Sequence, residues 1–211
     1  MSAKNIPISE ATVNRLSVYL RCLQILEREE EASISSQQMA KRFHLNSAQI
    51  RKDLAYFGAF GTRGVGYSIP HLKAQISRLL KLDEEKRVVI VGAGHLGQAL
   101  ADFQGFNSGG FKVVALFDID PAKVGKQTAK RGIPIHSVEQ INALVREQRV
   151  TLGVIAVHPQ SAQEVYDELV KAGVKGVLNF APAQIKEKPK ARLKAVDLKI
   201  NMETLSFFTT A

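Results

Sequence analysis

The chain has 211 residues, of which 45% are hydrophobic, and a formal net charge of +9. This length and composition are typical of two globular domains with ordinary hydrophobic cores. No apolar run approaches the roughly 20 residues of a membrane-spanning helix, the N-terminus has no apolar signal region, and a single cysteine cannot form an intramolecular disulfide. We therefore expect a cytoplasmic protein without membrane contact.

The positive charge is concentrated in the N-terminal part of the chain. Residues 1–82 contain 12 Lys and Arg against 6 Asp and Glu, a net +6, whereas residues 83–211 contain 17 against 14, a net +3. This asymmetry indicates a polyanionic partner for the N-terminal part. A basic domain that is merely well solvated would have the same composition.

Residues 7–29 have the apolar spacing of a helix, with Val13, Leu16, Leu20 and Leu23 on one face. Because Cys22 lies in this helix, we expect it to serve as a small packing residue and not as a reactive thiol.

Two short helices separated by a tight turn follow, which is the pattern of a helix-turn-helix motif. The first spans residues 35–43, and Ser35 and Gln38 have the spacing of a capping box. The second spans residues 47–57, with Asn46 as its N-cap. The glycine that comes next is predicted to end it.

The second helix has an apolar face and a basic face. Ile50, Leu54 and Phe57 are spaced to pack inward. The opposite face combines small residues with long cationic donors, which suit close approach to DNA phosphates and base edges. The candidate DNA contacts on this helix are Ser47, Gln49, Arg51 and Lys52. The alternative is that the two cations are ordinary solvated surface residues.

Residues 58–67 contain four glycines, one arginine and two aromatic residues. Such a segment permits tight turns, and it predicts a β-wing that places Arg63 in the DNA minor groove. An ordinary hairpin turn is the alternative. A helix over residues 72–82 follows, and the acidic residues 83–85 mark the boundary between domains 1–82 and 83–211.

The second domain opens with an apolar strand over residues 87–91 and a helix that runs through residue 103, joined by a glycine-rich loop. The loop fits the pattern G-x-G-x-x-G of dinucleotide-binding folds and consists of Gly92, Ala93, Gly94, His95, Leu96 and Gly97. In that pattern the glycines provide the turn, the approach to the pyrophosphate and the close packing of helix on strand. The phosphates would lie at the helix N-terminus.

The next strand, over residues 112–117, ends at Asp118. A carboxylate at this place accepts hydrogen bonds from the adenosine ribose and repels a 2′-phosphate, which favours NAD(H) over NADP(H). Asp120, which precedes a proline, is predicted to cap the next helix. The preference for NAD(H) is opposed by four nearby cations, Lys123, Lys126, Lys130 and Arg131.

Strands predicted over residues 132–135, 152–157 and 176–179 alternate with helices over 138–147 and 161–172. This alternation predicts an α/β domain with a doubly wound parallel sheet of the Rossmann type.

The segment after the last of these strands lies where ligands of such sheets bind. We predict that it forms a wall of the nicotinamide pocket through Asn179, Phe180, Ala181 and Pro182. The alternative is a structural turn with Phe180 in the core.

The basic, proline-interrupted residues 186–192 predict a loop, and residues 197–208 predict an amphipathic helix with Leu198, Met202 and Leu205 on one face. This helix is very apolar for a chain end. A partner subunit and the helix's own domain are the two alternatives for what covers it.

Over nearly its whole length the chain resembles the Rex family of redox-sensing transcriptional repressors. The resemblance is carried by the strings Tyr19-Leu20-Arg21, Gln49-Ile50-Arg51-Lys52-Asp53-Leu54, Phe57-Gly58, Gly61-Thr62-Arg63-Gly64-Val65-Gly66-Tyr67, Gly92–Gly97, Phe117-Asp118-Ile119-Asp120-Pro121 and Asn179-Phe180-Ala181-Pro182. The second and fourth strings together are highly specific, whereas the glycine motif alone is not.

The resemblance implies a homodimer with an N-terminal winged helix-turn-helix domain, a C-terminal Rossmann domain and a C-terminal helix exchanged between subunits. Members of the family bind operator DNA when NADH is scarce and release it when NADH rises. A two-fold dimer implies an inverted-repeat operator. Arg51 and Lys52 match the family's recognition helix, and Arg63 matches its wing arginine. Gly64 and Tyr67 of the same segment are further candidate DNA contacts.

The resemblance also concerns a contact that switches between states. Arg21 and Asp197 match positions that join a charged contact across the dimer, and Phe103 stands where a tyrosine often shares it. The family often has Thr-Val-Pro after the fourth strand. Here the sequence around Val157 differs, so we expect different contacts near the nicotinamide.

The sequence predicts no catalytic residue and no metal site. An alternative function is an NAD-dependent dehydrogenase with a DNA-binding appendage, which needs an acid or base beside the nicotinamide. His95 lies in the phosphate loop, and His158 is more typical of an ordinary loop residue. A third alternative is a module that binds CoA or another nucleotide.

Overall fold

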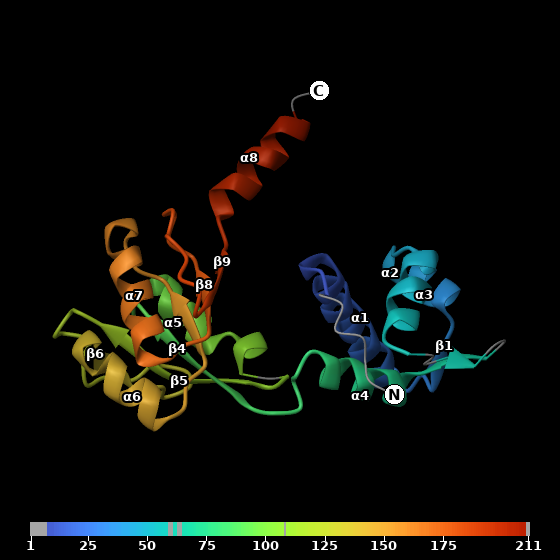
Figure 1. The fold of residues 1–211 in the computed structure, drawn as a ribbon, viewed down its shortest axis with the longest axis horizontal. Coiled ribbons are helices and arrows are strands. Elements are labelled where there is room, and N and C mark those ends of the chain that lie inside the picture. The colour runs from blue at the N-terminus through green and yellow to red at the C-terminus, as the bar shows by residue number, and fades with distance from the viewer. Residues whose placement is uncertain (1–7, 59–60, 63–64, 108, 210–211) are drawn as a thin grey trace. The chain divides into compact units, whose positions relative to one another are not determined.

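The computed structural model describes residues 8–58, 61–62, 65–107 and 109–209 (Figure 1). The chain divides into two compact units, Met1–Asp83 and Glu84–Ala211. This division lies one residue beyond the boundary that the sequence predicts. Arg63 and Gly64, which the sequence assigns to the wing, lie outside the described residues.

In its described residues, the N-terminal unit combines four helices with a small antiparallel sheet whose strand order is β1-β3-β2. Its elements are α1 (Glu10–Arg28), β1 (Ser33–Ile34), α2 (Ser36–Phe43), α3 (Ser47–Tyr56), β2 (Gly61–Thr62), β3 (Gly66–Ser68) and α4 (Ile69–Leu79). The helix pair α2–α3, followed by a β-hairpin, is the arrangement of a winged helix-turn-helix, as predicted.

Local hydrogen bonds account for the ends of these helices. The Ser35 hydroxyl accepts from the Gln38 N–H at 3.1 Å while the Gln38 side-chain oxygen accepts from the Ser35 N–H at 2.9 Å, so the predicted capping box forms. The Asn46 side chain caps α3 by accepting from the Gln49 N–H at 2.9 Å. Gly58 follows α3 with φ +122°, which a glycine adopts without strain.

One hydrophobic core holds this unit together. Leu23, Met39 and Ile50 are fully buried in it, and they come from α1, α2 and α3. The fourth helix begins at Ile69, three residues before the predicted start, because Pro70 fits the first turn of a helix without losing a hydrogen bond.

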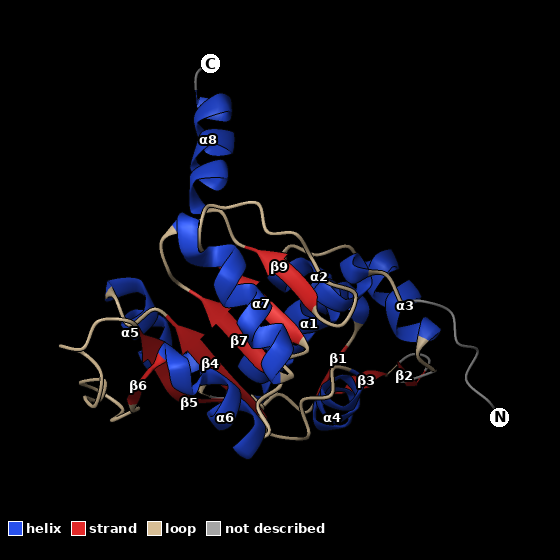
Figure 2. Cartoon of the chain, turned by 60° about the vertical axis from the view of Figure 1, so that its left-hand side comes forward, coloured by secondary structure: helices blue, strands red, loops and turns tan. Residues whose placement is uncertain are grey.

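The C-terminal unit is built on a six-stranded sheet (Figure 2). Its strands are β4 (Lys86–Val91), β5 (Phe111–Asp118), β6 (Ile135–Ser137), β7 (Leu152–Ile155), β8 (Gly176–Asn179) and β9 (Arg192–Ala195). Its α-helices are α5 (His95–Asp102), α6 (Ile141–Glu147), α7 (Ala162–Ala172) and α8 (Leu198–Thr209), and short 3-10 turns cover Gln104–Phe106, Val138–Gln140 and Pro159–Ser161.

The strand order β6-β5-β4-β7-β8-β9, with all neighbours parallel, is that of a Rossmann fold. Strands β4 and β7 lie side by side, and the chain winds outward from them in opposite directions. The predicted doubly wound parallel sheet is therefore confirmed.

Alternating side chains of β4 reach opposite faces of the sheet. Val89 and Val91 pack in a buried cluster with Tyr166 of α7, whereas Ile90 packs in a second cluster with Ala101 of α5. Helices α6 and α7 lie across the first face (Figure 2). A strand buried on both sides explains why residues 88–91 are a continuous apolar run.

The predicted helix after Asp120 is wrong. The side-chain carboxylate of Asp120 accepts a hydrogen bond from the Ala122 N–H at 2.9 Å. The backbone carbonyl of Asp120, however, accepts from the N–H groups of Lys123 and Val124 within a series of turns. Gly125 has φ +82°, a conformation that does not continue a right-handed helix. Asp120 therefore begins a turn.

Strand β9 is absent from the sequence-based prediction. The loop predicted over residues 186–192 ends one residue early, because Arg192 already pairs with Gly176 of β8. Tyr166 fixes this loop: its hydroxyl donates to the carbonyl of Ala191 at 3.3 Å and accepts from the N–H of Lys188 at 3.0 Å. An edge strand with three exposed residues out of four carries little hydrophobic signal.

Helix α8 extends away from the sheet of its own unit (Figures 1 and 2). None of its residues is buried, and Phe207 and Phe208 are 78% and 74% exposed. The sequence left two alternatives for what covers this helix, its own domain or a partner subunit. The structure does not show the helix packed on its own domain.

We predict that Tyr166→Phe destabilises the C-terminal unit by about 1–3 kcal/mol, because it removes two hydrogen bonds and leaves the buried Ala191 carbonyl without its donor. Denaturant unfolding measures this loss. Tyr67→Phe in the N-terminal unit is the control, and an equal loss in both variants would contradict the prediction.

Candidate dinucleotide site and nucleic-acid interface

The glycine loop is fixed by two close backbone approaches. A Cβ on Gly92, whose φ is +103°, would lie 2.3 Å from the carbonyl oxygen of Ala156. A Cβ on Gly97 would lie 1.7 Å from the carbonyl oxygen of Gly92. Only glycine at both positions lets α5 begin directly at the end of β4 and lets β7 lie beside it.

Gly94 differs, because a Cβ there would meet nothing within 4 Å. It is the N-cap of α5, and no side chain caps the N–H groups of the first turn. The side chain of Gln98 donates to the carbonyl of Ala93 at 2.9 Å and holds the loop. Open space before uncapped N–H groups at a helix N-terminus fits a pyrophosphate. The predicted residues therefore fit a dinucleotide.

Asp118 lies at the end of β5 next to this loop and is buried. Its carboxylate accepts from the N–H of Ala93 at 2.8 Å, the N–H of Asp120 at 2.9 Å and the ammonium of Lys123 at 3.2 Å. Burial alone would raise the pKa of this carboxyl, but these donors outweigh it and lower the pKa. Ribose hydroxyl groups would have to share the carboxylate with Lys123.

The loops after β4, β7 and β8 meet at the carboxyl edge of the sheet, at the point where the winding reverses. The N–H of Ala156 donates to the carbonyl of Val91 at 2.8 Å, and the N–H of Phe180 donates to the carbonyl of Ile155 at 2.9 Å. Ligands of open α/β sheets bind at this place. Val157, a predicted coenzyme contact, is half-buried and follows β7 there.

The turn after β8 has a clear structural role. The side-chain amide of the buried Asn179 donates to the carbonyl of Ala181 and accepts from its N–H, both at 2.9 Å. Phe180 packs against the cluster that contains Ile90. Pro182 is exposed. These contacts agree with the alternative of a structural turn, and the nicotinamide role of these residues stays a prediction.

Helix α3 has the two faces that the sequence predicts. Ile50 and Leu54 are buried in the core, whereas Arg51 and Lys52 are exposed. The Arg51 guanidinium donates to the hydroxyl of Ser36 in α2 at 3.2 Å. The other interface candidates among the described residues are half-buried, and they are Ser47, Gln49 and Tyr67.

The sequence analysis missed a buried carboxylate in α3. Asp53 is 4% exposed and accepts hydrogen bonds from Arg15 and Tyr19 of α1 and from Gln49 of its own helix. The sequence does carry a signal for it, because Asp53 is the single acidic residue of a basic helix and lies four positions after Gln49, a spacing at which helix side chains can interact. Gln49, a predicted DNA contact, is therefore also part of this cluster.

The predicted switch residues lie in three different elements. Arg21 is an exposed residue of α1, and the exposed Phe103 follows α5 and has an edge contact with Phe106. The Asp197 carboxylate caps α8 by accepting from the N–H groups of Lys199 and Ile200 at 2.9 and 3.1 Å. Their role in a switch stays a prediction.

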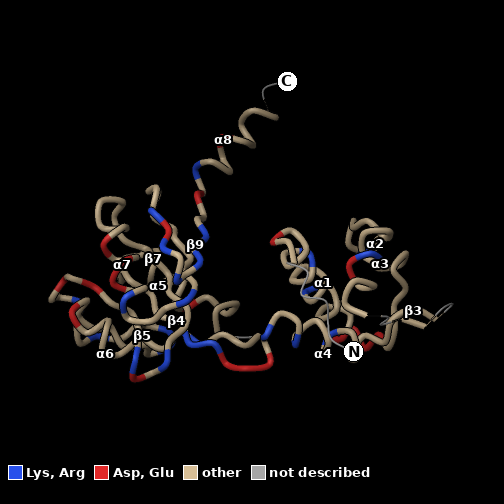
Figure 3. The backbone as a smooth tube through the Cα atoms, viewed as in Figure 1, with Lys and Arg blue, Asp and Glu red and all other residues tan. Residues whose placement is uncertain are grey.

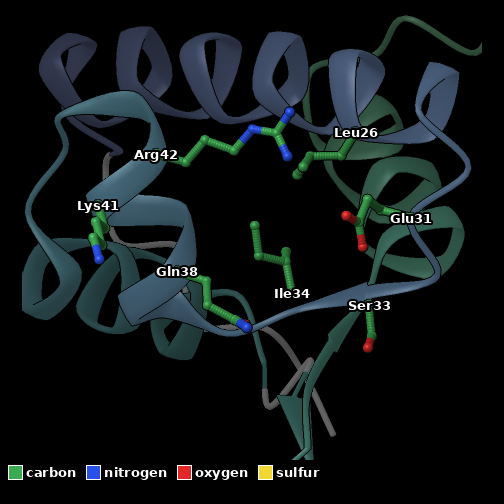
Figure 4. A pocket seen from close by; sticks show the side chains of 7 residues that line it. All are labelled: Leu26, Glu31, Ser33, Ile34, Gln38, Lys41 and Arg42. Atoms are coloured by element: carbon green, nitrogen blue, oxygen red, sulfur yellow. The ribbon is translucent and has the colours of Figure 1, made fainter.

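A hollow of about 440 Å³ in the N-terminal unit lies between α1, β1 and α2 (Figure 4). Leu26 and Ile34 of the core line it together with charged side chains such as Lys41 and Arg42. It contains none of the predicted site residues.

Basic residues also gather in the C-terminal unit, along β9 and the loop before it (Figure 3). Within the described part of the chain, no group of His, Cys, Asp and Glu side chains could hold a metal ion. In the same residues, no helix is long and apolar enough to cross a membrane.

Comparisons with known proteins find a match for each unit. Residues 7–55 match the family described as the N-terminus of putative DNA-binding proteins, and residues 83–183 match the CoA binding domain family. The redox-sensing transcriptional repressor Rex of Brevibacillus brevis is 42% identical over 208 residues, which cover 99% of this chain and 100% of that protein. The Rex protein of Carboxydothermus hydrogenoformans is 46% identical over 205 residues, 97% of either chain.

The chain belongs to the Rex family. Among solved structures, the Rex-family repressor RSP has a TM-score of 0.86 at 31% identity, covering 97% of this chain and 95% of that one. RSP in complex with NAD⁺ and operator DNA has a TM-score of 0.91 at 32% identity, covering 97% and 94%. RSP has also been solved in complex with NADH, with a TM-score of 0.85 at 30% identity and the same coverage as RSP alone.

We predict that Gly97→Ala and Gly94→Ala separate folding from coenzyme binding in this member of the Rex family. Gly97→Ala should destabilise the C-terminal unit by about 3 kcal/mol or more, because its Cβ would overlap a backbone oxygen. Gly94→Ala should change stability by less than about 0.5 kcal/mol but weaken NADH binding. Thermal unfolding and NADH titration measure the two effects, and tight NADH binding by Gly94→Ala would contradict the pyrophosphate assignment.

Proposed function

We propose that this protein is a redox-sensing transcriptional repressor that binds operator DNA when the NADH/NAD⁺ ratio is low and is released from it by NADH. The observation that carries the proposal is the presence, in one chain, of a winged helix-turn-helix with a basic exposed helix face and a Rossmann sheet with an open glycine loop. Its family and the RSP complexes with operator DNA and with NADH support the same reading.

The DNA contacts proposed are Arg51 and Lys52 of α3, with Arg63 of the wing. Small neighbours at positions 48 and 55 are exposed beside the two α3 cations, so the helix can approach a groove closely. Affinity for DNA should fall steeply with salt, because phosphate contacts release counterions.

The coenzyme proposed is NAD(H), bound by the loop of Gly92 to Gly97 and by Asp118. The two redox forms share adenosine and pyrophosphate, so these residues cannot tell them apart. Discrimination depends on the nicotinamide, which is cationic when oxidised and neutral when reduced. An apolar wall, formed by Val157 and the turn from Phe180 to Pro182, disfavours the uncompensated cation and so favours NADH.

The assembly proposed is a homodimer in which α8 packs on the partner subunit. The helix exposes Leu198, Leu205, Phe207 and other apolar side chains, which a soluble repressor has to cover. A two-fold dimer places its recognition helices about 34–36 Å apart, or at a multiple of that distance, on an inverted-repeat operator.

We propose no catalytic role. The dehydrogenase alternative requires an acid or base beside the nicotinamide, and His158 is its best candidate. This side chain is exposed after β7 and has no hydrogen bond to another described residue. Incubation with NAD⁺ and a panel of hydroxy acids, followed by NADH absorbance, distinguishes the two functions.

The decisive experiment selects a duplex from a random DNA pool and measures its affinity at fixed total coenzyme while the NADH:NAD⁺ ratio is varied. A coupling of about 1–3 kcal/mol predicts that NADH weakens operator binding by about 5–150-fold. NADPH and CoA serve as controls. An unchanged affinity with saturating NADH would overturn the proposal.

Asp118→Ala should weaken NADH binding, because the ribose loses its acceptor and the Ala93 N–H loses its partner. Isothermal calorimetry measures the change. Asp120→Ala is the control, since it removes a nearby carboxylate that binds the Ala122 N–H and, at 3.6 Å, Lys123, but does not bind the glycine loop. Equal NADH affinity in Asp118→Ala and the wild type would contradict the ribose assignment.

A further inference from the structure

Asp53 is the only acidic residue of α3, and its carboxylate is almost completely buried. It accepts from the Arg15 guanidinium at 2.6 and 2.8 Å, from the Tyr19 hydroxyl at 2.9 Å and from the Gln49 side-chain amide at 2.7 Å. Four donors of this kind keep a carboxylate in its charged form despite burial. Burial raises the pKa of Asp53, but Arg15, Gln49 and Tyr19 together lower it.

The charged form of Asp53 decides which way the Gln49 amide points. An ionised carboxylate only accepts hydrogen bonds, so the amide must turn its NH₂ group, Nε2, toward Asp53. The carbonyl oxygen, Oε1, is then on the other side of the amide group. It accepts no hydrogen bond from any described residue.

Gln49 lies in the first turn of α3, and residues of that turn contact base edges in helix-turn-helix proteins. Its backbone N–H is fixed by Asn46 at 2.9 Å, so both ends of the residue are held. The side chain lines a groove of about 260 Å³ between α1 and α3, together with the exposed Lys52 and Tyr56.

We propose that Asp53 is a positioning residue that fixes Gln49 as a hydrogen-bond acceptor toward DNA. Oε1 of Gln49 then reads an exocyclic amino group in the major groove, N6 of adenine or N4 of cytosine. Guanine O6 and thymine O4 are acceptors themselves, so they are disfavoured at this position. The inference rests on the proposed binding of operator DNA.

A purely structural role of Asp53 is the competing explanation, because the cluster also joins α1 to α3. In that case, loss of the cluster would weaken binding to every DNA sequence alike. A positioning role instead changes the base preference at one position of each half-site and leaves non-specific binding unchanged.

The test selects a preferred duplex with the wild-type protein and then substitutes each base pair of one half-site in turn. Affinities are compared for the wild type, Gln49→Ala and Asp53→Asn. We expect one position at which the wild type prefers adenine or cytosine by about 5–150-fold over guanine or thymine. Both variants should reduce this preference to less than about 2-fold. The four bases at that position distinguish adenine from cytosine as the partner.

Lys52→Ala is the matched control on the same helix face. It should weaken binding to all sequences and reduce the salt slope by about 1, with the base preference retained. Tyr19→Phe removes one donor but keeps the carboxylate, so it should also retain the preference.

Asp53→Asn that lowers affinity for all duplexes equally, with the base preference intact, would overturn the proposal, as would a Gln49→Ala variant that keeps every base preference of the wild type. If Asp53→Asn does not fold, as shown by thermal unfolding, NMR of the wild-type complex with DNA decides. A hydrogen-bond coupling between Gln49 Nε2 and the Asp53 carboxyl is expected, and its absence would contradict the proposal. Selection that enriches no sequence would instead contradict the proposed function itself.

Discussion

The C-terminal unit depends on one backbone approach, that of α5 to the end of β4. Gly97 lies so close to the carbonyl of Gly92 that any side chain at this position would overlap it. This approach brings the uncapped first turn of α5 to the carboxyl edge of the sheet, where Asp118 also binds the loop through Ala93. The affinity expected for a pyrophosphate therefore comes from backbone N–H groups and open space, and it needs no cationic side chain.

The N-terminal unit positions its functional helix by a different means. There, a buried carboxylate takes the place of the close backbone contact, and Asp53 binds α1 and the Gln49 side chain at once. A buried charge costs desolvation energy, and it is retained in a fold when enough donors offset that cost. Arg15 supplies two of those donors in a bidentate geometry. The same cluster stabilises the unit and orients a polar side chain toward its surface.

Under the proposed function, neither unit can convert redox state into release of DNA by itself. The nicotinamide wall that distinguishes NADH from NAD⁺ belongs to the C-terminal unit, whereas the proposed DNA contacts belong to the N-terminal unit. A ligand shifts an equilibrium between two arrangements only by its difference in affinity for them. The link therefore requires subunits that move relative to one another. The exposed apolar face of α8 is the surface of this chain best suited to join two copies.

The sequence by itself determined the fold class, most elements and the glycine loop, because these depend on local signals: the capping box of Ser35, the apolar strand at residues 87–91 and the G-x-G-x-x-G spacing. It gave the wrong structure after Asp120, where turn geometry outweighs an N-cap pattern, and it missed β9, whose pairing comes from β8. Only the tertiary structure brought Arg15 and Tyr19 to Asp53, since these residues are 38 and 34 positions apart in the chain. Hydrogen bonds between distant segments leave no periodic pattern, so their partners are known only once the helices have packed.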